Sequence, residues 1–175
     1  MHDDPLESLG RFHRRIERQL AGLAGLPVRL EGGLDAAAIG SAAATIEFFD
    51  VRLPVHHAQE EHELIPVLLR RITLSEERDR FREIRMRLES DHRELRDVWR
   101  RLRAPLEAIA EGVPRKLPGD LIQYFRAVHA IHISTEESAL HAMATRWLTP
   151  GDLDALAQRL QGQPAARHAT VMPVT

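Results

Sequence analysis

Apolar residues recur at spacings of three and four along most of this chain. This is the period of an amphipathic α-helix, and it differs from the two-residue alternation of a β-strand. Three short interruptions, at residues 26–33, 73–75 and 112–119, divide the pattern into four long segments. Long helices joined by short or moderate loops favour antiparallel neighbours. The sequence therefore predicts an all-α protein built as an up-down-up-down four-helix bundle.

The C-terminal part of the chain carries the signals of a short fifth helix. Thr149 offers an N-cap, Pro150 suits the first helical position, and the apolar pattern runs to about Leu160. Ser75 is a similar N-cap candidate for the third helix. We expect one bundle domain over residues 4–161 and a flexible tail, rich in proline and alanine, over residues 162–175.

The second segment contains Pro54 and Pro66, each of which removes a backbone hydrogen bond and bends a helix. We expect this segment to remain one bent but continuous helix. Regular spacing predicts that its inward-facing seam consists of Ile39, Ala42, Ile46, Phe49, Leu53, His56, Glu60 and Val67.

Histidine is frequent and cysteine is absent. The 175 residues include ten His and no Cys, and the formal net charge is -2. Neither a disulfide nor a thiolate metal site can form, and no strong attraction to nucleic acid is expected. There is no apolar run of about 18 residues, and the chain begins with an acidic segment. The sequence thus predicts a soluble, cytoplasmic protein that binds neither nucleic acid nor a membrane and is compatible with a homodimer.

Each of the four predicted bundle helices has an apolar seam that a histidine interrupts. Two of these histidines are followed at i+4 by a glutamate, which places both side chains on one helix face. Burying so many ionisable groups in one layer is costly unless a partner pairs with all of them, and a metal cation does so. The candidate metal ligands are His13, His56, Glu60, His92, His132 and Glu136.

The candidates fall into two similar halves of the chain. Each half supplies one His from its first helix and a His-x-x-x-Glu pair from its second helix. Two equivalent halves suggest two metal ions that share the two carboxylates. Nitrogen and oxygen donors without sulfur suit iron or manganese, whereas a single structural zinc would use only four ligands.

These motifs resemble the hemerythrin-like, or HHE cation-binding, family. The resemblance rests on His13, on HHxxEE followed by Leu-Ile-Pro in residues 56–66, on Asp91-His92 and on His132-x-x-x-Glu136-Glu137. It covers residues 4–160 and implies a four-helix bundle with an oxo- or hydroxo-bridged pair of iron ions, with manganese or zinc as alternatives. It further implies that His13 and His56 hold one iron and that His92 and His132 hold the other. Glu60 and Glu136 would bridge the two ions.

Two ligand assignments stay open. His57 pairs with Glu61 as well as His56 pairs with Glu60, although the seam favours the second pair. Oxygen-carrying hemerythrins place a further His one turn beyond the ligand of the third helix, where this chain has Arg96. One imidazole is then missing, unless His129 supplies it. The remaining histidines are expected at the surface or in the termini: His2, His62, His141 and His168.

The departure at Arg96 weighs against reversible O2 carriage and leaves three hypotheses. The first is a non-haem di-iron protein that binds or senses O2 or redox state, or that handles iron. The second is a di-iron enzyme acting on peroxide or nitric oxide at open metal positions. The third is a non-catalytic interaction module stabilised by a metal such as zinc. In the first two, the expected partner is a small diatomic or peroxide ligand.

Overall fold

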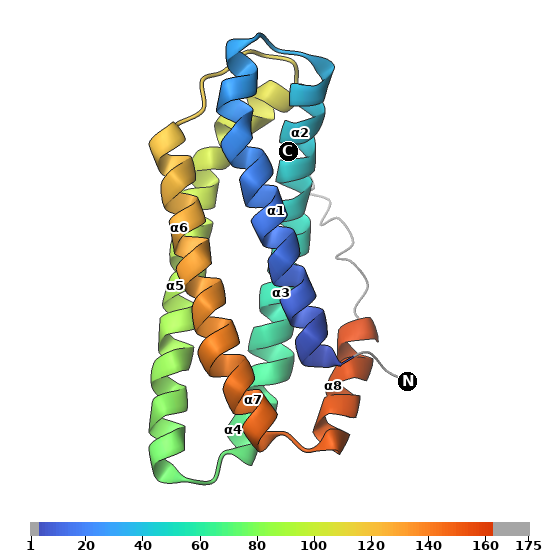
Figure 1. Cartoon of the computed structure of the whole chain (residues 1–175), viewed down its shortest axis with the longest axis vertical. Coiled ribbons are helices and arrows are strands. Elements are labelled where there is room, and N and C mark those ends of the chain that lie inside the picture. The colour runs from blue at the N-terminus through green and yellow to red at the C-terminus, as the bar shows by residue number, and fades with distance from the viewer. Residues whose placement is uncertain (1–3, 163–175) are drawn as a thin grey trace, which may run out of the picture.

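The computed structural model describes residues 4–162, and within this range the chain forms helices and short connections without any strand (Figure 1). The first bundle helix is α1 (Pro5–Glu31). The second is a continuous run of α2 (Ala36–Glu47), η1 (Phe48–Arg52), α3 (Leu53–Gln59), η2 (Glu60–Leu64) and α4 (Ile65–Arg71). The third is α5 (Ser75–Ala110), and the fourth combines α6 (Gly119–Thr135), η3 (Glu136–Leu140) and α7 (His141–Trp147). The short α8 (Pro150–Gly162) follows.

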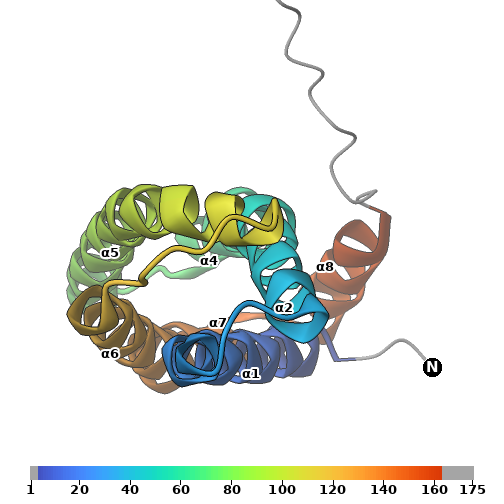
Figure 2. The same ribbon diagram turned by 90° about the horizontal axis from the view of Figure 1, so that it is seen from above.

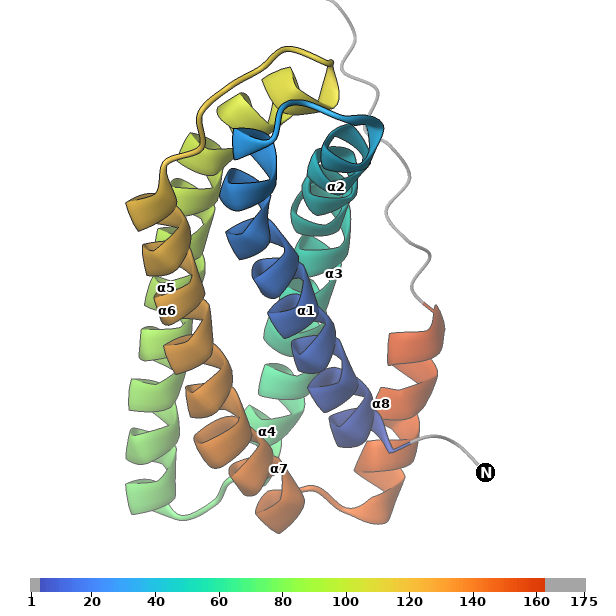
Figure 3. The ribbon, with the colours of Figure 1, turned by 45° about the horizontal axis from the view of Figure 1, so that its top comes forward.

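The four long helices alternate in direction around a common axis, and α8 lies outside the ring beside α1 (Figure 2). The loops after α1 and after α5 close one end of the bundle, and the connections after α4 and after α7 lie at the other (Figure 3). This arrangement confirms the predicted all-α bundle with a fifth helix. The predicted tail begins at the last residue of α8, and its remaining residues, 163–175, lie outside the described part of the chain.

Side-chain caps fix several helix starts. The Asp4 carboxylate accepts a hydrogen bond from the Leu6 backbone N–H at 2.9 Å, and Thr149 and Asp152 cap α8 reciprocally through side chain and backbone. The predicted N-cap at Thr149 is therefore correct. The predicted N-cap at Ser75 is wrong by one residue, because α5 begins at Ser75 and the extended residue before it is Leu74.

The second helix is continuous, as predicted, and it accommodates both prolines through wider, π-helical turns. A π-helical turn precedes each proline, with η1 ending before Pro54 and η2 ending before Pro66. Each π turn carries one extra residue, which relieves the clash and the lost hydrogen bond that a proline causes in a regular α-helix. A third π turn, η3, occurs in the fourth helix without a proline.

The extra residue in η1 changes which side chains face inward before it. Ala38, Ala42 and Thr45 are buried in α2, whereas Ile39 and Ile46 are only half-buried. The predicted seam was therefore one residue out of register at these two isoleucines, because a regular three-four spacing cannot anticipate an inserted residue.

Two apolar clusters form the core, one at each end of the bundle. One contains Ile16, Leu95 and the aromatic residues near Phe125, and the other contains Leu9, Leu88 and residues of α8 such as Leu156. In α1, His13 lies between Leu9 of one cluster and Ile16 of the other. In α5, His92 likewise lies between Leu88 and Leu95. The clusters are therefore separated by a layer of ionisable side chains.

Candidate metal centre

All four bundle helices contribute to the ionisable layer. The exposed fraction of its side chains does not exceed 7%. The layer consists of His13 from α1, His56 and His57 from α3, Glu60 from η2, His92 from α5, His132 from α6 and Glu136 from η3.

The first group of converging ligand atoms comes from His13, His56, Glu60 and Glu136, which place one donor atom each within 4.8 Å of the others. His13 Nε2 lies 3.1 Å from Glu136 Oε2 and 3.7 Å from Glu60 Oε1. His56 Nε2 lies 3.3 Å from Glu60 Oε1. Two imidazoles and two carboxylates thus converge at one point.

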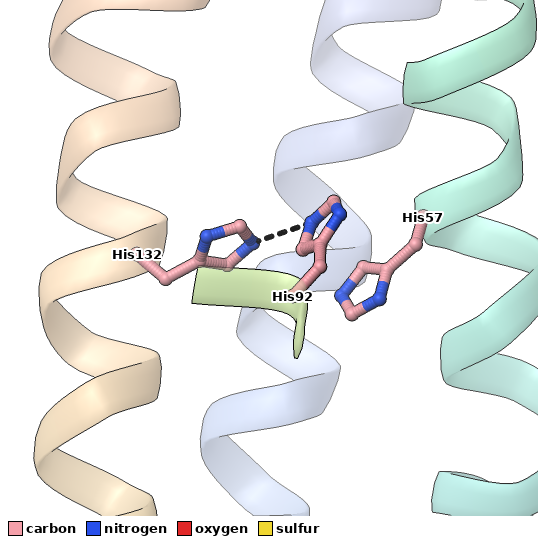
Figure 4. A group of neighbouring side chains, drawn as sticks. All are labelled: His57, His92 and His132. Atoms are coloured by element: carbon pink, nitrogen blue, oxygen red, sulfur yellow. Dashed lines mark hydrogen bonds between the residues drawn. The ribbon is translucent and has the colours of Figure 1, made fainter. Parts of the chain in front are cut away.

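The second group contains three imidazoles, from His57, His92 and His132. Figure 4 shows the three rings directed toward one another from three different helices. The Nε2 atoms of His92 and His132 are 3.1 Å apart, and the ring of His57 stacks on that of His92 at 3.8 Å between centroids. Glu60 and Glu136 also form a group with His92 and His132, so both carboxylates belong to both sides of the centre.

Both shared carboxylates stand at the first residue of a π turn. Glu60 begins η2 and Glu136 begins η3, in the related sequences Glu-Glu-His-Glu-Leu and Glu-Glu-Ser-Ala-Leu. Because η3 has no proline to accommodate, the shared feature of the two turns is the glutamate pair. The π turns therefore help to place the glutamate of each His-x-x-x-Glu pair in the ionisable layer. Such turns are frequent at functional sites.

The second glutamate of each pair supports a histidine on a neighbouring helix. Glu61 Oε1 lies 2.6 Å from His92 Nδ1, and Glu137 Oε1 lies 3.0 Å from His13 Nδ1. A carboxylate on Nδ1 keeps a proton there and leaves the Nε2 lone pair free, which is how metal-binding histidines are commonly oriented. Asp91 Oδ2 lies 3.7 Å from His132 Nδ1, which is beyond hydrogen-bond distance.

Burial keeps the imidazoles of α3 and α5 neutral. It lowers the pKa of His56 to about 3 and holds the pKa of His57 well below its usual value. Burial and the nearby His132 also lower the pKa of His92. Neutral rings offer lone pairs, which is the state that a metal requires of them.

His13, Glu60 and Glu136 shift one another's pKa values. Burial and the charge of Glu136 raise the pKa of Glu60 well above its usual value. Burial also acts to raise the pKa of Glu136, but contacts with His13 and His132 lower it well below that value. Burial acts against the charged form of His13, yet Glu136 and Glu60 raise its pKa to about 10. Without a cation, the centre therefore holds a proton on His13, which a metal would displace.

The donor set fits a metal ion. Among the buried atoms without a hydrogen-bond partner in the described residues are His56 Nε2, His57 Nε2 and both carboxylate oxygens of Glu60 and of Glu136. Buried polar atoms are rarely left unpaired because each costs about 1–3 kcal/mol. Nitrogen and oxygen donors of this kind suit iron, manganese or zinc.

The structure brings together all six residues expected from the sequence and adds His57, which had been weighed only as a replacement for His56. The two lie next to each other in α3 and face different groups, so His57 supplies the third imidazole beside His92 and His132. Arg96 is exposed, and His129 belongs to none of the ligand groups among the described residues. The sequence signal for a seventh ligand was the pair of adjacent histidines, His56 and His57, in one buried helix.

One of the histidines expected at the surface lies beside the centre instead. His141, at the start of α7, is half-buried, and its ring stacks on that of His13 at 5.6 Å between centroids. The expectation missed this contact because η3 turns the following residues toward α1. His62 is exposed, as expected, and His2 and His168 lie outside the described residues.

A buried layer of imidazoles and carboxylates inside a four-helix bundle defines a metal-binding protein of the non-haem, sulfur-free kind. Over residues 4–144 the chain matches the hemerythrin HHE cation binding domain, and it belongs to that family. It is also similar to an uncharacterized protein of Haemophilus influenzae, with 26% identity over 136 residues, which are 77% of this chain and 76% of that protein.

The family and its cation-binding character, expected from the sequence, are thereby confirmed. None of the described helices is both long and apolar enough to cross a membrane.

Proposed function

We propose that this chain holds two iron ions and uses them to bind or sense O2 or a change of redox state. The observation that carries the proposal is the pair of ligand groups that share Glu60 and Glu136. We assign His13 and His56 to one ion and His57, His92 and His132 to the other, with the two glutamates bridging. Iron in such a centre supplies reversible oxidation and binding positions for small ligands.

The chain's own residues prepare the layer for this role. The unequal number of imidazoles in the two groups leaves the ion of His13 and His56 with fewer protein donors, so we place the external ligand there. Glu61 and Glu137 fix the tautomers of His92 and His13. The apolar clusters on both sides exclude bulk water and restrict access to small molecules.

Elemental analysis of the purified full chain tests the stoichiometry, and absorption spectra recorded with and without O2, azide or peroxide test the response. We expect two irons per chain and an absorption band that changes with these ligands. One metal per chain, or an iron-loaded protein whose spectrum ignores all three, would contradict the proposal. Zinc alone, with no redox response, would favour a metal-stabilised interaction module instead.

A second candidate is turnover of hydrogen peroxide or nitric oxide at the same centre. The specific observation in its favour is His129, a fully buried imidazole three residues before His132, which adds a hydrogen-bonding group beside the ligand layer. Multiple turnovers that vanish in a His56→Ala variant would support an enzyme, whereas a single stoichiometric reaction would support a sensor.

A further inference from the structure

The turn of each bundle helix next to the ionisable layer forms a second buried layer, on the side of the loop after α1. Because the helices alternate in direction, this turn follows His13 and His92 but precedes His56 and His132. It contributes three aliphatic side chains and one imidazole, all less than 7% exposed. The four residues are Ile16, Leu53, Leu95 and His129.

His129 differs from the other three because its side chain is polar, and only one of its two ring nitrogens is hydrogen-bonded. Its Nδ1 lies 2.9 Å from the Phe125 carbonyl oxygen, which can only accept, so Nδ1 carries the proton. Nε2 then presents a lone pair, and this buried atom has no hydrogen-bond partner among the described residues. Burial lowers the pKa of His129 to about 4, which keeps the ring neutral.

The proposed metal ions leave this nitrogen unexplained. The converging groups use the donors of His13, His56, His57, His92 and His132, and His129 is in none of them. An unpaired buried nitrogen with no function would be replaced without loss by an aliphatic residue such as its three neighbours in the layer. Nε2 therefore needs a hydrogen-bond donor that the described residues do not provide.

A cavity between the second and third bundle helices lies near this layer, although His129 is not among its lining residues. The cavity has a volume of about 140 Å³ and is lined by Phe49, Leu53, His57 and Leu95, among others. It shares Leu53 and Leu95 with the layer of His129, and the ring of Phe49 contacts that of His129 at 5.8 Å between centroids. The volume of the cavity is ample for a water molecule or hydrogen peroxide.

We propose that His129 Nε2 accepts a hydrogen bond from a small proton-bearing ligand, water or hydrogen peroxide, in the layer adjoining the metal centre. This inference rests on the proposed iron centre, and its choice of ligand favours the second candidate, hydrogen peroxide, over O2. Ligands without a proton, such as O2, nitric oxide and the azide anion, gain nothing from His129. His129 is thus a specificity-determining residue that favours peroxide or water over diatomic gases.

The first test compares ligand affinities in the iron-loaded full chain. His129→Phe keeps an aromatic ring between Phe49 and Phe125 but removes the nitrogen, and His129→Gln restores an acceptor. We expect the Phe variant to bind hydrogen peroxide about two- to tenfold more weakly, the loss of one net hydrogen bond. Its azide affinity should stay within about twofold, and Gln should recover part of the peroxide affinity. Equal losses for both ligands, or none, would overturn the inference.

The second test does not depend on reactivity or on a variant that folds. In protein labelled with ¹⁵N-histidine and loaded with zinc, the Nε2 resonance of His129 reports whether its lone pair accepts a hydrogen bond. We expect an upfield position relative to an unpaired imidazole nitrogen, and a further shift when hydrogen peroxide is added. An Nε2 resonance typical of a free lone pair in both conditions would contradict the inference. A chain that binds no metal would instead contradict the proposed function.

Discussion

Glu61 and His92 are joined across two helices by a contact of 2.6 Å between a carboxylate oxygen and Nδ1, and Glu137 repeats this relation with His13 at 3.0 Å. In each glutamate pair, one residue faces the centre and the next holds an imidazole of the neighbouring helix in place. These contacts connect the second helix to the third and the fourth helix to the first, and each orients a nitrogen donor.

Glu61→Gln is expected to weaken metal binding about 10- to 100-fold, because the amide no longer stabilises the required tautomer of His92 as a carboxylate does. Competition against a chelator of known affinity measures the change. Glu83→Gln, an exposed substitution on α5, is the matched control and should leave affinity unchanged. Equal affinity in both variants would show that the contact does not support the centre.

His56→Leu and His57→Leu are each expected to lower the iron content, because the two rings belong to different ligand groups. Elemental analysis together with the absorption spectrum separates the two effects. His62→Leu provides a control in η2 with an exposed side chain. A His57→Leu protein with full iron content and an unchanged spectrum would show that His57 is not a ligand and that only the six residues expected from the sequence bind the metal.

The metal-free protein is expected to lose stability as pH falls from about 6.5 toward about 4. The pKa of His129 is lowered from 6.5 to about 4, so in this range the unfolded chain binds a proton that the folded chain does not. One such group contributes a slope of about 1.4 kcal/mol per pH unit. Urea unfolding of the wild type and of His129→Phe at several pH values measures it. The variant should have a shallower slope, and identical slopes would disprove a buried neutral His129.

Glu60→Gln is expected to stabilise the metal-free protein while abolishing its stabilisation by metal. Burial and Glu136 raise the pKa of Glu60, which means that its charge is unfavourable in the empty layer. In the wild type, metal at 100 times its dissociation constant should add about 2.7 kcal/mol to the unfolding free energy. Thermal unfolding with and without metal measures both effects, and a metal-induced rise of equal size in the variant would contradict the shared role of Glu60.

The regular spacing of apolar residues was sufficient to predict the bundle and most of its inward-facing positions. The spacing failed at Ile39 and Ile46 for a physical reason. A π turn inserts one residue, and nothing in the local pattern reveals it except the proline that follows.

The six expected site residues could be chosen because each stands on an apolar seam. His57 was weighed only as an alternative, since adjacent residues point about 100° apart on an ideal helix and one helix face was assumed to carry one ligand. His141 was missed for a related reason, because its contact with His13 follows the third π turn. The misplaced isoleucines and the missed contact of His141 therefore both lie next to π turns, whereas the N-cap error at Ser75 does not.

The division of the core into two apolar clusters has a mechanical consequence. The helix backbones run continuously through the layer, but the side chains that pack between the two clusters are charged and neutral donors around the proposed ions. A change in the charge or radius of the proposed ions would alter the helix spacing in this layer and so would shift one cluster relative to the other. Since α8 packs through Leu156 on the cluster next to the α4–α5 connection, its outer face would move with that end. A change at the proposed metal centre would then alter the position of the exposed face of α8.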